Sequence, residues 1–132
     1  MTSRNLLIKE FRGESIGEIN HLTSAEEYFQ NTTLRPILKI QNDLFIAVFI
    51  EYCIKQKNTF FNLAVNKKLE YIEQNIQNDM KFRDFLKGIV IGFFTLDEYK
   101  AYSKNASNLN KRMISMLIER IKSQVQIIEK PV

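Results

Sequence analysis

The residue types that most often do chemistry are few in this sequence and are not spaced for it. The only histidine, His21, has no second His or Cys at the spacing of a metal-ligand pair. The carboxylates of Glu26 and Glu27 are adjacent, as are those of Asp97 and Glu98, so the two members of each pair point in different directions on a helix. We therefore predict no metal site, no bound cofactor and no catalytic residue.

The single cysteine, Cys53, is the one candidate nucleophile of the thiol type. It lies in the most apolar part of the sequence, within LFIAVFIEYCI. Burial raises a thiol pKa and hides the sulfur from reagents, so Cys53 is expected to be an inert core residue.

A glycine pair in the segment KGIVIGFF, residues 87–94, is a further candidate site. The segment lacks the Lys-Ser/Thr of a phosphate-binding P-loop and the preceding strand of a dinucleotide fingerprint. An apolar helical stripe continues through it and brings Gly88 and Gly92 side by side at the edge of the stripe. We predict that the two glycines form a groove in which another helix backbone packs closely. A cofactor slot over the glycines is the alternative.

Two charged residues interrupt apolar helical surfaces. Arg120 falls within the apolar arc of the last helix with Gln124 one turn further on, and Glu51 interrupts an apolar stretch of the central helix. A buried charge is costly unless it is paired. We predict that Glu51 and Arg120 pair with each other, or that each finds a polar partner inside the bundle.

The elements that must hold these residues are all helical. The chain has 132 residues with only four Gly and two Pro, and no stretch has the pattern of a strand. Residues 1–22 are expected to form an irregular arm, and residues 23–132 a single helical domain. The capping signals Thr23 with Glu26, Asp79, and Thr95 with Glu98 mark helix starts. We expect an irregular, orthogonal bundle of about five to seven helices around a buried central helix at about 34–55.

The last helix, at about 107–128, has an apolar arc that covers more than half of its circumference. This is wider than one packed side requires. Either the helix lies between two layers, or it also faces another subunit.

Charge and hydropathy limit the partners of the chain. The net charge of +4 is concentrated in residues 99–132, where seven Lys/Arg face two Glu, but no nucleic-acid-binding motif accompanies them. Outside the opening residues and the loops, the longest uncharged run, residues 88–96, is too short for a membrane helix, which needs roughly 20 residues. The N-terminus lacks the apolar region of a signal peptide. A single cysteine allows no disulfide within the chain, which is typical of a reducing compartment. We expect a cytoplasmic protein that does not enter a membrane.

Three segments, SAEEYFQNTTLRPILKIQNDL, KLEYIEQNI and KGIVIGFFTLDEYKAY, resemble a family of small bacterial helical proteins of uncharacterised function. The similarity covers about residues 23–124. Members are sometimes labelled glyoxalases, but glyoxalases of the usual kind are β-rich metal enzymes with His and Glu ligands. The resemblance implies a helical fold and adds no mechanism.

The missing catalytic chemistry and the wide apolar arc together suggest a non-enzymatic cytoplasmic interaction or accessory protein, forming a homodimer through residues 107–128. The first alternative is a small-ligand-binding protein or an enzyme, with a pocket lined by Tyr99 and Tyr102 and closed by Arg35 or Arg120. The second alternative is a weak nucleic-acid binder that uses the basic C-terminal third.

Overall fold

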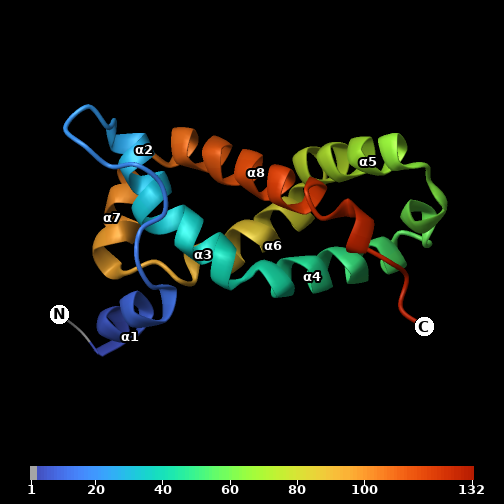
Figure 1. Cartoon of the computed structure of the whole chain (residues 1–132), viewed down its shortest axis with the longest axis horizontal. Coiled ribbons are helices and arrows are strands. Elements are labelled where there is room, and N and C mark those ends of the chain that lie inside the picture. Colours follow the sequence, from blue (N-terminus) through green and yellow to red (C-terminus); the bar gives the residue numbers. More distant parts are fainter. Residues whose placement is uncertain (1–2) are drawn as a thin grey trace.

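The computed structural model describes residues 3–132 and has an all-α fold, as predicted (Figure 1). No β-strand occurs within residues 3–132. The longer helices are α1 (Ser3–Arg12), α4 (Asn42–Lys55), α5 (Val65–Asn78), α6 (Met80–Ile91), α7 (Leu96–Lys104) and α8 (Ala106–Lys122). The shorter elements are α2 (Ala25–Phe29), the π-helix η1 (Gln30–Leu34), α3 (Arg35–Ile40), and the 3₁₀-helices η2 (Thr59–Asn62) and η3 (Val125–Ile127). None of the described helices is both long and apolar enough to cross a membrane.

The bundle is elongated, with α8 and α5 along one long side and α3 and α4 along the other (Figure 1). Helix α8 contacts α5, α6, α7 and η1 and keeps one polar face, with Lys111, Ser115 and Glu119, in solvent. Helices α1, α2 and α7 are grouped at one end, and the loop that carries η2 lies at the other end.

The core is rich in aromatic side chains. The ring of Phe49 on α4 meets the edge of Phe60 from η2, with 5.3 Å between the ring centroids. Tyr52 stacks on Phe82 of α6 at 3.9 Å. Aliphatic side chains complete this core, and those of α5, α6 and α8 with no exposed surface are Ile72, Ile76, Leu86, Val90, Met113, Leu117 and Ile121.

The expected central helix is not the helix that buries the most side chains. Residues 34–55 are divided at Gln41 into α3 and α4, and α4 buries only the face formed by Phe45, Phe49 and Cys53. Leu44 on its opposite side is exposed. Helix α8 instead buries six side chains over its length: Leu109, Met113, Ile114, Leu117, Ile118 and Ile121. Of the two alternatives for its wide apolar arc, packing between layers therefore accounts for it within the chain.

The prediction of an irregular arm over residues 1–22 is wrong for Ser3–Arg12, which form α1; residues 1–2 lie outside the described residues. The helix ends at Gly13, whose φ of +78° is a left-handed conformation that glycine adopts without strain. Residues 13–24 form an irregular loop. Gly17 is required there because a Cβ would lie only 2.8 Å from the Asn31 side chain. Helix α1 buries Asn5, Ile8 and Arg12, so two of its three buried residues are polar, and an apolar stripe does not reveal it.

Candidate functional site

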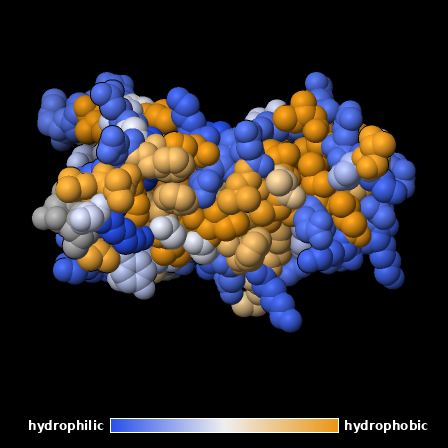
Figure 2. Space-filling model, turned by 90° about the horizontal axis from the view of Figure 1, so that it is seen from below, coloured by the Kyte–Doolittle hydropathy of each residue, from blue (hydrophilic) through white to orange (hydrophobic). Residues whose placement is uncertain are grey.

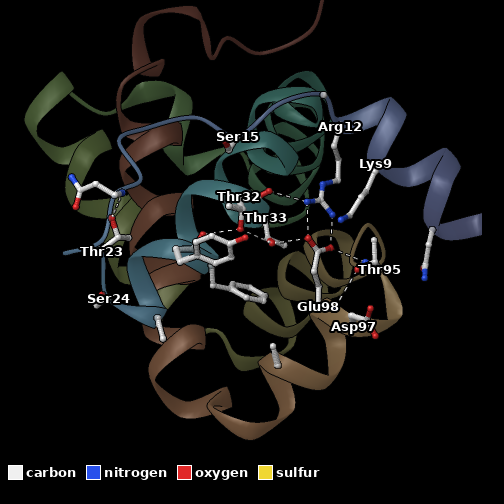
Figure 3. A pocket seen from close by; sticks show the side chains of 17 residues that line it. Lys9, Arg12, Ser15, Thr23, Ser24, Thr32, Thr33, Thr95, Asp97 and Glu98 are labelled. Atoms are coloured by element: carbon white, nitrogen blue, oxygen red, sulfur yellow. Dashed lines mark hydrogen bonds and ion pairs between the residues drawn. The ribbon is translucent and has the colours of Figure 1, made fainter. Parts of the chain in front are cut away.

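A cleft with a volume of about 830 Å³ lies between α1, the loop of residues 13–24, α2 and the start of α7 (Figure 3). Its walls are rich in hydroxyl groups, contributed by Ser15, Thr23, Ser24, Thr32, Thr33 and Thr95. Figure 3 shows the side chains of Arg12 and Glu98 meeting at one side of this cleft, one from α1 and the other from α7.

The guanidinium of Arg12 joins three elements at this point. Its Nη1 and Nη2 each donate to one carboxylate oxygen of Glu98, with 2.8 Å between Nη2 and Oε2. Nη1 also donates to the carbonyl of Phe93 after α6, at 3.1 Å, and Nη2 to the carbonyl of Thr32, at 2.9 Å. Pro36 has no N–H for the carbonyl of Thr32, four residues earlier, so Arg12 supplies a donor that the helix lacks.

The carboxylate of Glu98 is saturated with hydrogen bonds. Besides Arg12, it accepts from the Thr33 hydroxyl at 2.7 Å and from the Thr95 backbone N–H at 2.8 Å. Only 15% of the Glu98 side chain and 3% of the Arg12 side chain are exposed. Burial alone would raise the pKa of Glu98, but the hydrogen bonds from Arg12, Thr95 and Thr33 together hold this pKa below its ordinary value.

This arrangement makes Glu98 a structural group and not a catalytic base. A general base needs a free lone pair within reach of a substrate proton. Each oxygen of Glu98 already accepts two hydrogen bonds, and the positive charge of Arg12 cancels its negative charge. Lys9 extends from α1 toward this pair, and Asp97 lies at the start of α7 (Figure 3). Neither has an ion-pair partner among the described residues.

A second hollow, of about 580 Å³, brings together three residues that the sequence singled out, Arg35, Arg120 and Gln124. We call it the Arg35–Arg120 hollow. Arg120 Nη1 donates to Asn42 Oδ1 at 3.3 Å, so Arg120 has the expected polar partner inside the bundle. Asn42 and Gln124 exchange two hydrogen bonds, of 2.7 and 2.8 Å. Burial lowers the pKa of Arg120 from its usual value.

Glu51 does not take part in this cluster, so the predicted pair between Glu51 and Arg120 is wrong. Glu51 lies on the exposed side of α4, 3.7 Å from Lys55 one turn later. The physical reason is that α4 buries only one face, whereas the prediction treated the helix as buried all round.

The predicted tyrosine-lined pocket is not formed among residues 3–132. Tyr99 is exposed on α7. The Tyr102 hydroxyl donates to Asn110 at 2.6 Å, and its ring packs against Phe94. Neither tyrosine lines a cavity with Arg35 or Arg120.

No helix within residues 3–132 lies in the predicted glycine groove. Gly88 is exposed, and a Cβ added to it would meet no atom within 4 Å. Gly92 is the C-cap residue of α6, and its carbonyl accepts a hydrogen bond from Arg4 Nη2 at 3.1 Å. The prediction of close packing at this pair is therefore wrong within the chain.

An apolar surface joins α1, α4 and α6, and the ion pair between Asp84 and Lys87 lies next to Gly88 on α6. Phe11 of α1 stacks on Phe93 just after α6, with 5.7 Å between ring centroids. A hollow of about 350 Å³ lies between α4 and α6 beside Phe85. Figure 2 shows hydrophobic side chains gathered in a band across this side of the molecule. We call this surface the α4–α6 face, and its apolar residues are Leu7, Phe11, Leu44, Val48, Phe85, Ile89 and Phe93.

The basic C-terminal third does not form one open stripe of cations. Arg112 donates to Gln30 at 2.9 Å, and Lys122 lies 3.1 Å from Glu73 of α5. These side chains tie α8 to its neighbours.

Cys53 and the acidic side chains form no metal centre in the described part of the chain, where no three His, Cys, Asp or Glu residues gather. Cys53 has no exposed surface, and burial raises the pKa of its thiol to about 12.

Comparisons of this chain with protein-family models, with curated proteins and with solved structures find no match. The resemblance to small bacterial helical proteins therefore stays a prediction, and the geometry alone must support a function.

Proposed function

We propose that this chain is a non-enzymatic interaction protein that associates with a second copy of itself through the α4–α6 face. The observation that carries the proposal is the exposure of large apolar side chains on adjacent elements of that face. Leu7 is 66% exposed, Phe11 55%, Leu44 44% and Phe85 56%. Monomeric soluble proteins rarely expose contiguous apolar patches larger than a few hundred Å².

The size of the molecule is compatible with an interface of ordinary dimensions. A stable interface buries about 800 Å² on each partner. That area is about a tenth of the accessible surface of this chain, 8206 Å². We expect the α4–α6 face, which draws on three helices, to supply that area.

The charges at the edge of the face favour a second copy over a strongly charged partner. Glu51 and Lys55 line the hollow between α4 and α6 and lie 3.7 Å apart. In a two-fold dimer every contact between two different residues occurs twice, once in each direction. Glu51 of one copy can therefore face Lys55 of the other, and Lys55 of the first copy can face Glu51 of the second. Phe85 both lines this hollow and protrudes beside it, which suits insertion into the same hollow of a second copy.

The exposed glycine supports the same partner. A glycine within a helix costs about 1 kcal/mol relative to alanine. Nothing in the described chain uses the space above Gly88. Close approach of a helix from a second copy would make use of that missing side chain.

The proposed surface of self-association differs from the one predicted from the sequence, residues 107–128. The large apolar side chains of α8 pack inside the chain, and none of them is among the exposed large hydrophobic residues. The excess apolar surface lies on α4, α6 and α1 instead.

Sedimentation velocity on three proteins tests the proposal. The unaltered chain should sediment as a dimer, and Phe85→Glu as a monomer, because a short charged side chain would replace the aromatic ring that fills the hollow, and burying that charge is costly. Leu22→Glu is the matched control, since Leu22 is 81% exposed in the loop outside the face. This variant should remain dimeric. A monomeric unaltered chain, or equal masses for both variants, would overturn the proposal.

Gly88→Ala separates loss of association from loss of folding. In the monomer a Cβ at position 88 contacts no other atom, and alanine favours the helix more than glycine does. The unfolding free energy of the monomer, measured with denaturant, should therefore rise by up to about 1 kcal/mol. The same methyl group should weaken the dimer. A variant that is more stable and associates as tightly as the unaltered chain would argue against contact at Gly88.

A further inference from the structure

The Arg35–Arg120 hollow lies between η1 and α3 on one side and the C-terminal half of α8 on the other, with the start of α4 beside them. It combines two guanidinium groups with apolar surface from Leu38 and Met116. This site is separate from the α4–α6 face, and no step in the proposed self-association uses it.

The two cations of the hollow have no anion in the described part of the chain. Glu119 is the only acid among the residues that line it, and its exposed carboxylate lies 4.0 Å from Lys122. No carboxylate of residues 3–132 lies within ion-pair distance of Arg35 or Arg120. The hollow therefore carries a net positive charge.

Most hydrogen-bond donors of these guanidinium groups are unused. A guanidinium has five N–H donors. Arg120 makes one side-chain bond, to Asn42 at 3.3 Å, which is longer than most N–H···O bonds. Arg35 makes no side-chain hydrogen bond within the described chain. Both residues are half-buried, and a partly desolvated cation is unfavourable until an anion pairs with it.

The surroundings hold Arg120 in position. Gln124 Nε2 donates to Asn42 Oδ1 at 2.7 Å and to the Arg120 carbonyl at 3.0 Å, and Asn42 Nδ2 donates back to Gln124 Oε1 at 2.8 Å. These amides satisfy one another and leave the guanidinium donors for a ligand. Such support from a neighbouring network is what a pre-formed binding site needs.

We infer that the hollow binds a small molecule through an oxyanion, a carboxylate or a phosphate monoester, held between Arg35 and Arg120. The planar guanidinium fork matches the paired oxygens of both groups. Leu38 and Met116 would contact the apolar part of the same molecule.

NMR titration of isotope-labelled protein with three matched probes tests the inference. Butyrate and butyl phosphate carry the two anions on the same apolar tail, and butanol is the uncharged control. At least one anion should bind and shift the amide signals of α3 and the C-terminal half of α8, and butanol should not. Butyrate alone would identify a carboxylate ligand, and butyl phosphate alone a phosphate monoester. Absence of binding by both anions, or equal binding by butanol, would overturn the inference.

Charge-removing variants supply the second measurement. Arg35→Gln and Arg120→Gln should each weaken anion binding about tenfold or more, because each removes charge-assisted hydrogen bonds. Lys111→Gln is the matched control, since Lys111 is an exposed cation of α8 that does not line the hollow. It should bind as the unaltered chain does. Unchanged binding in both arginine variants would place the anion elsewhere and refute the site. Arg35→Gln should also leave the ligand-free fold no less stable, because it removes an unpaired charge.

Discussion

Replacing Arg12 by Met removes the centre of the contact between α1 and the rest of the fold. The substitution keeps an unbranched side chain but deletes every N–H donor. Glu98 then loses both guanidinium bonds, and the carbonyls of Phe93 and Thr32 each lose a donor. The carboxylate of Glu98 would remain largely buried and without its counter-charge.

The expected loss of unfolding free energy depends on the hydrogen-bond donors that Glu98 keeps in the variant. Removing one partner of a buried ion pair costs about 3–5 kcal/mol of unfolding free energy. Glu98 keeps two donors, the Thr33 hydroxyl and the Thr95 N–H. We therefore expect the lower end, about 3 kcal/mol, a large fraction of the 5–15 kcal/mol typical of domains.

Urea unfolding at pH 7 and at pH 4 gives the measurement. In the unaltered chain the folded pKa of Glu98 is lowered, so its stabilising contribution is present above its unfolded pKa and is lost as the pH falls through the folded value. In Arg12→Met the largest lowering influence is gone and burial remains, so the pKa of Glu98 rises. Protonation then removes the uncompensated charge, and the difference from the unaltered chain should shrink at pH 4.

Two outcomes would refute this reasoning. A cost below about 1 kcal/mol at pH 7 is typical of exposed pairs and would mean that the contact is not buried. A cost that does not change between pH 7 and pH 4 would mean that Glu98 is not the group left unpaired. As a control, the Arg12→Met/Glu98→Gln double variant should cost less than the sum of the single variants, because the two side chains contact each other.

Three further predictions concern the core. Cys53 should resist thiol reagents at pH 8 in the folded chain and react once urea is added, because burial raises its pKa to about 12; reaction at the rate of a free thiol would contradict its burial. Leu117→Ala should lower the unfolding free energy by about 2–5 kcal/mol in urea titrations, while Leu22→Ala in the exposed loop should change it by less than about 0.5 kcal/mol. Tyr52→Phe should cost about 1 kcal/mol in the same measurement, since it removes one hydrogen bond of 2.8 Å to Asp79, and an unchanged midpoint would mean that water replaces the bond.

Local signals located the helix starts well. The capping box of Thr95 and Glu98 is formed, and Asp79 caps α6 by accepting from the Phe82 N–H at 3.2 Å. At α2 the cap is Ser24 and not Thr23, one residue later than predicted. Capping depends on neighbours in sequence, so a single sequence can reveal it.

Neighbours in sequence do not reveal which helix buries the most side chains. Both α4 and α8 have apolar residues around most of their circumference, and composition does not say which one the others surround. Packing decides this: α8 has contacts with α5, α6, α7 and η1 and buries six side chains, whereas α4 buries three. An excess of apolar surface was predicted on the last helix, but it lies on α1, α4 and α6.

The site at Arg12 and Glu98 left two traces in the sequence, the capping box of Thr95 with Glu98 and the proline at position 36. Pro36 implies that the carbonyl of Thr32 lacks its usual helical donor. Nothing local indicates that Arg12 supplies the replacement, because the partners come together only in the folded chain. The sequence predicted Arg120 as a charge within an apolar arc and Arg35 as a residue that could close a pocket, but their common hollow depends on how α3 meets α8.

The docking of α1 has a consequence for the order in which the protein folds. Its side-chain bonds, from Arg4 to Gly92 and Phe94, from Leu96 to Asn5, and from Arg12 to Glu98, join residues 86 to 91 positions apart. Contacts of such high sequence separation require a long loop to close first. We therefore expect α1 to attach after α6 and α7 have packed and to detach before them, so its amide protons should exchange with solvent faster than those of α8.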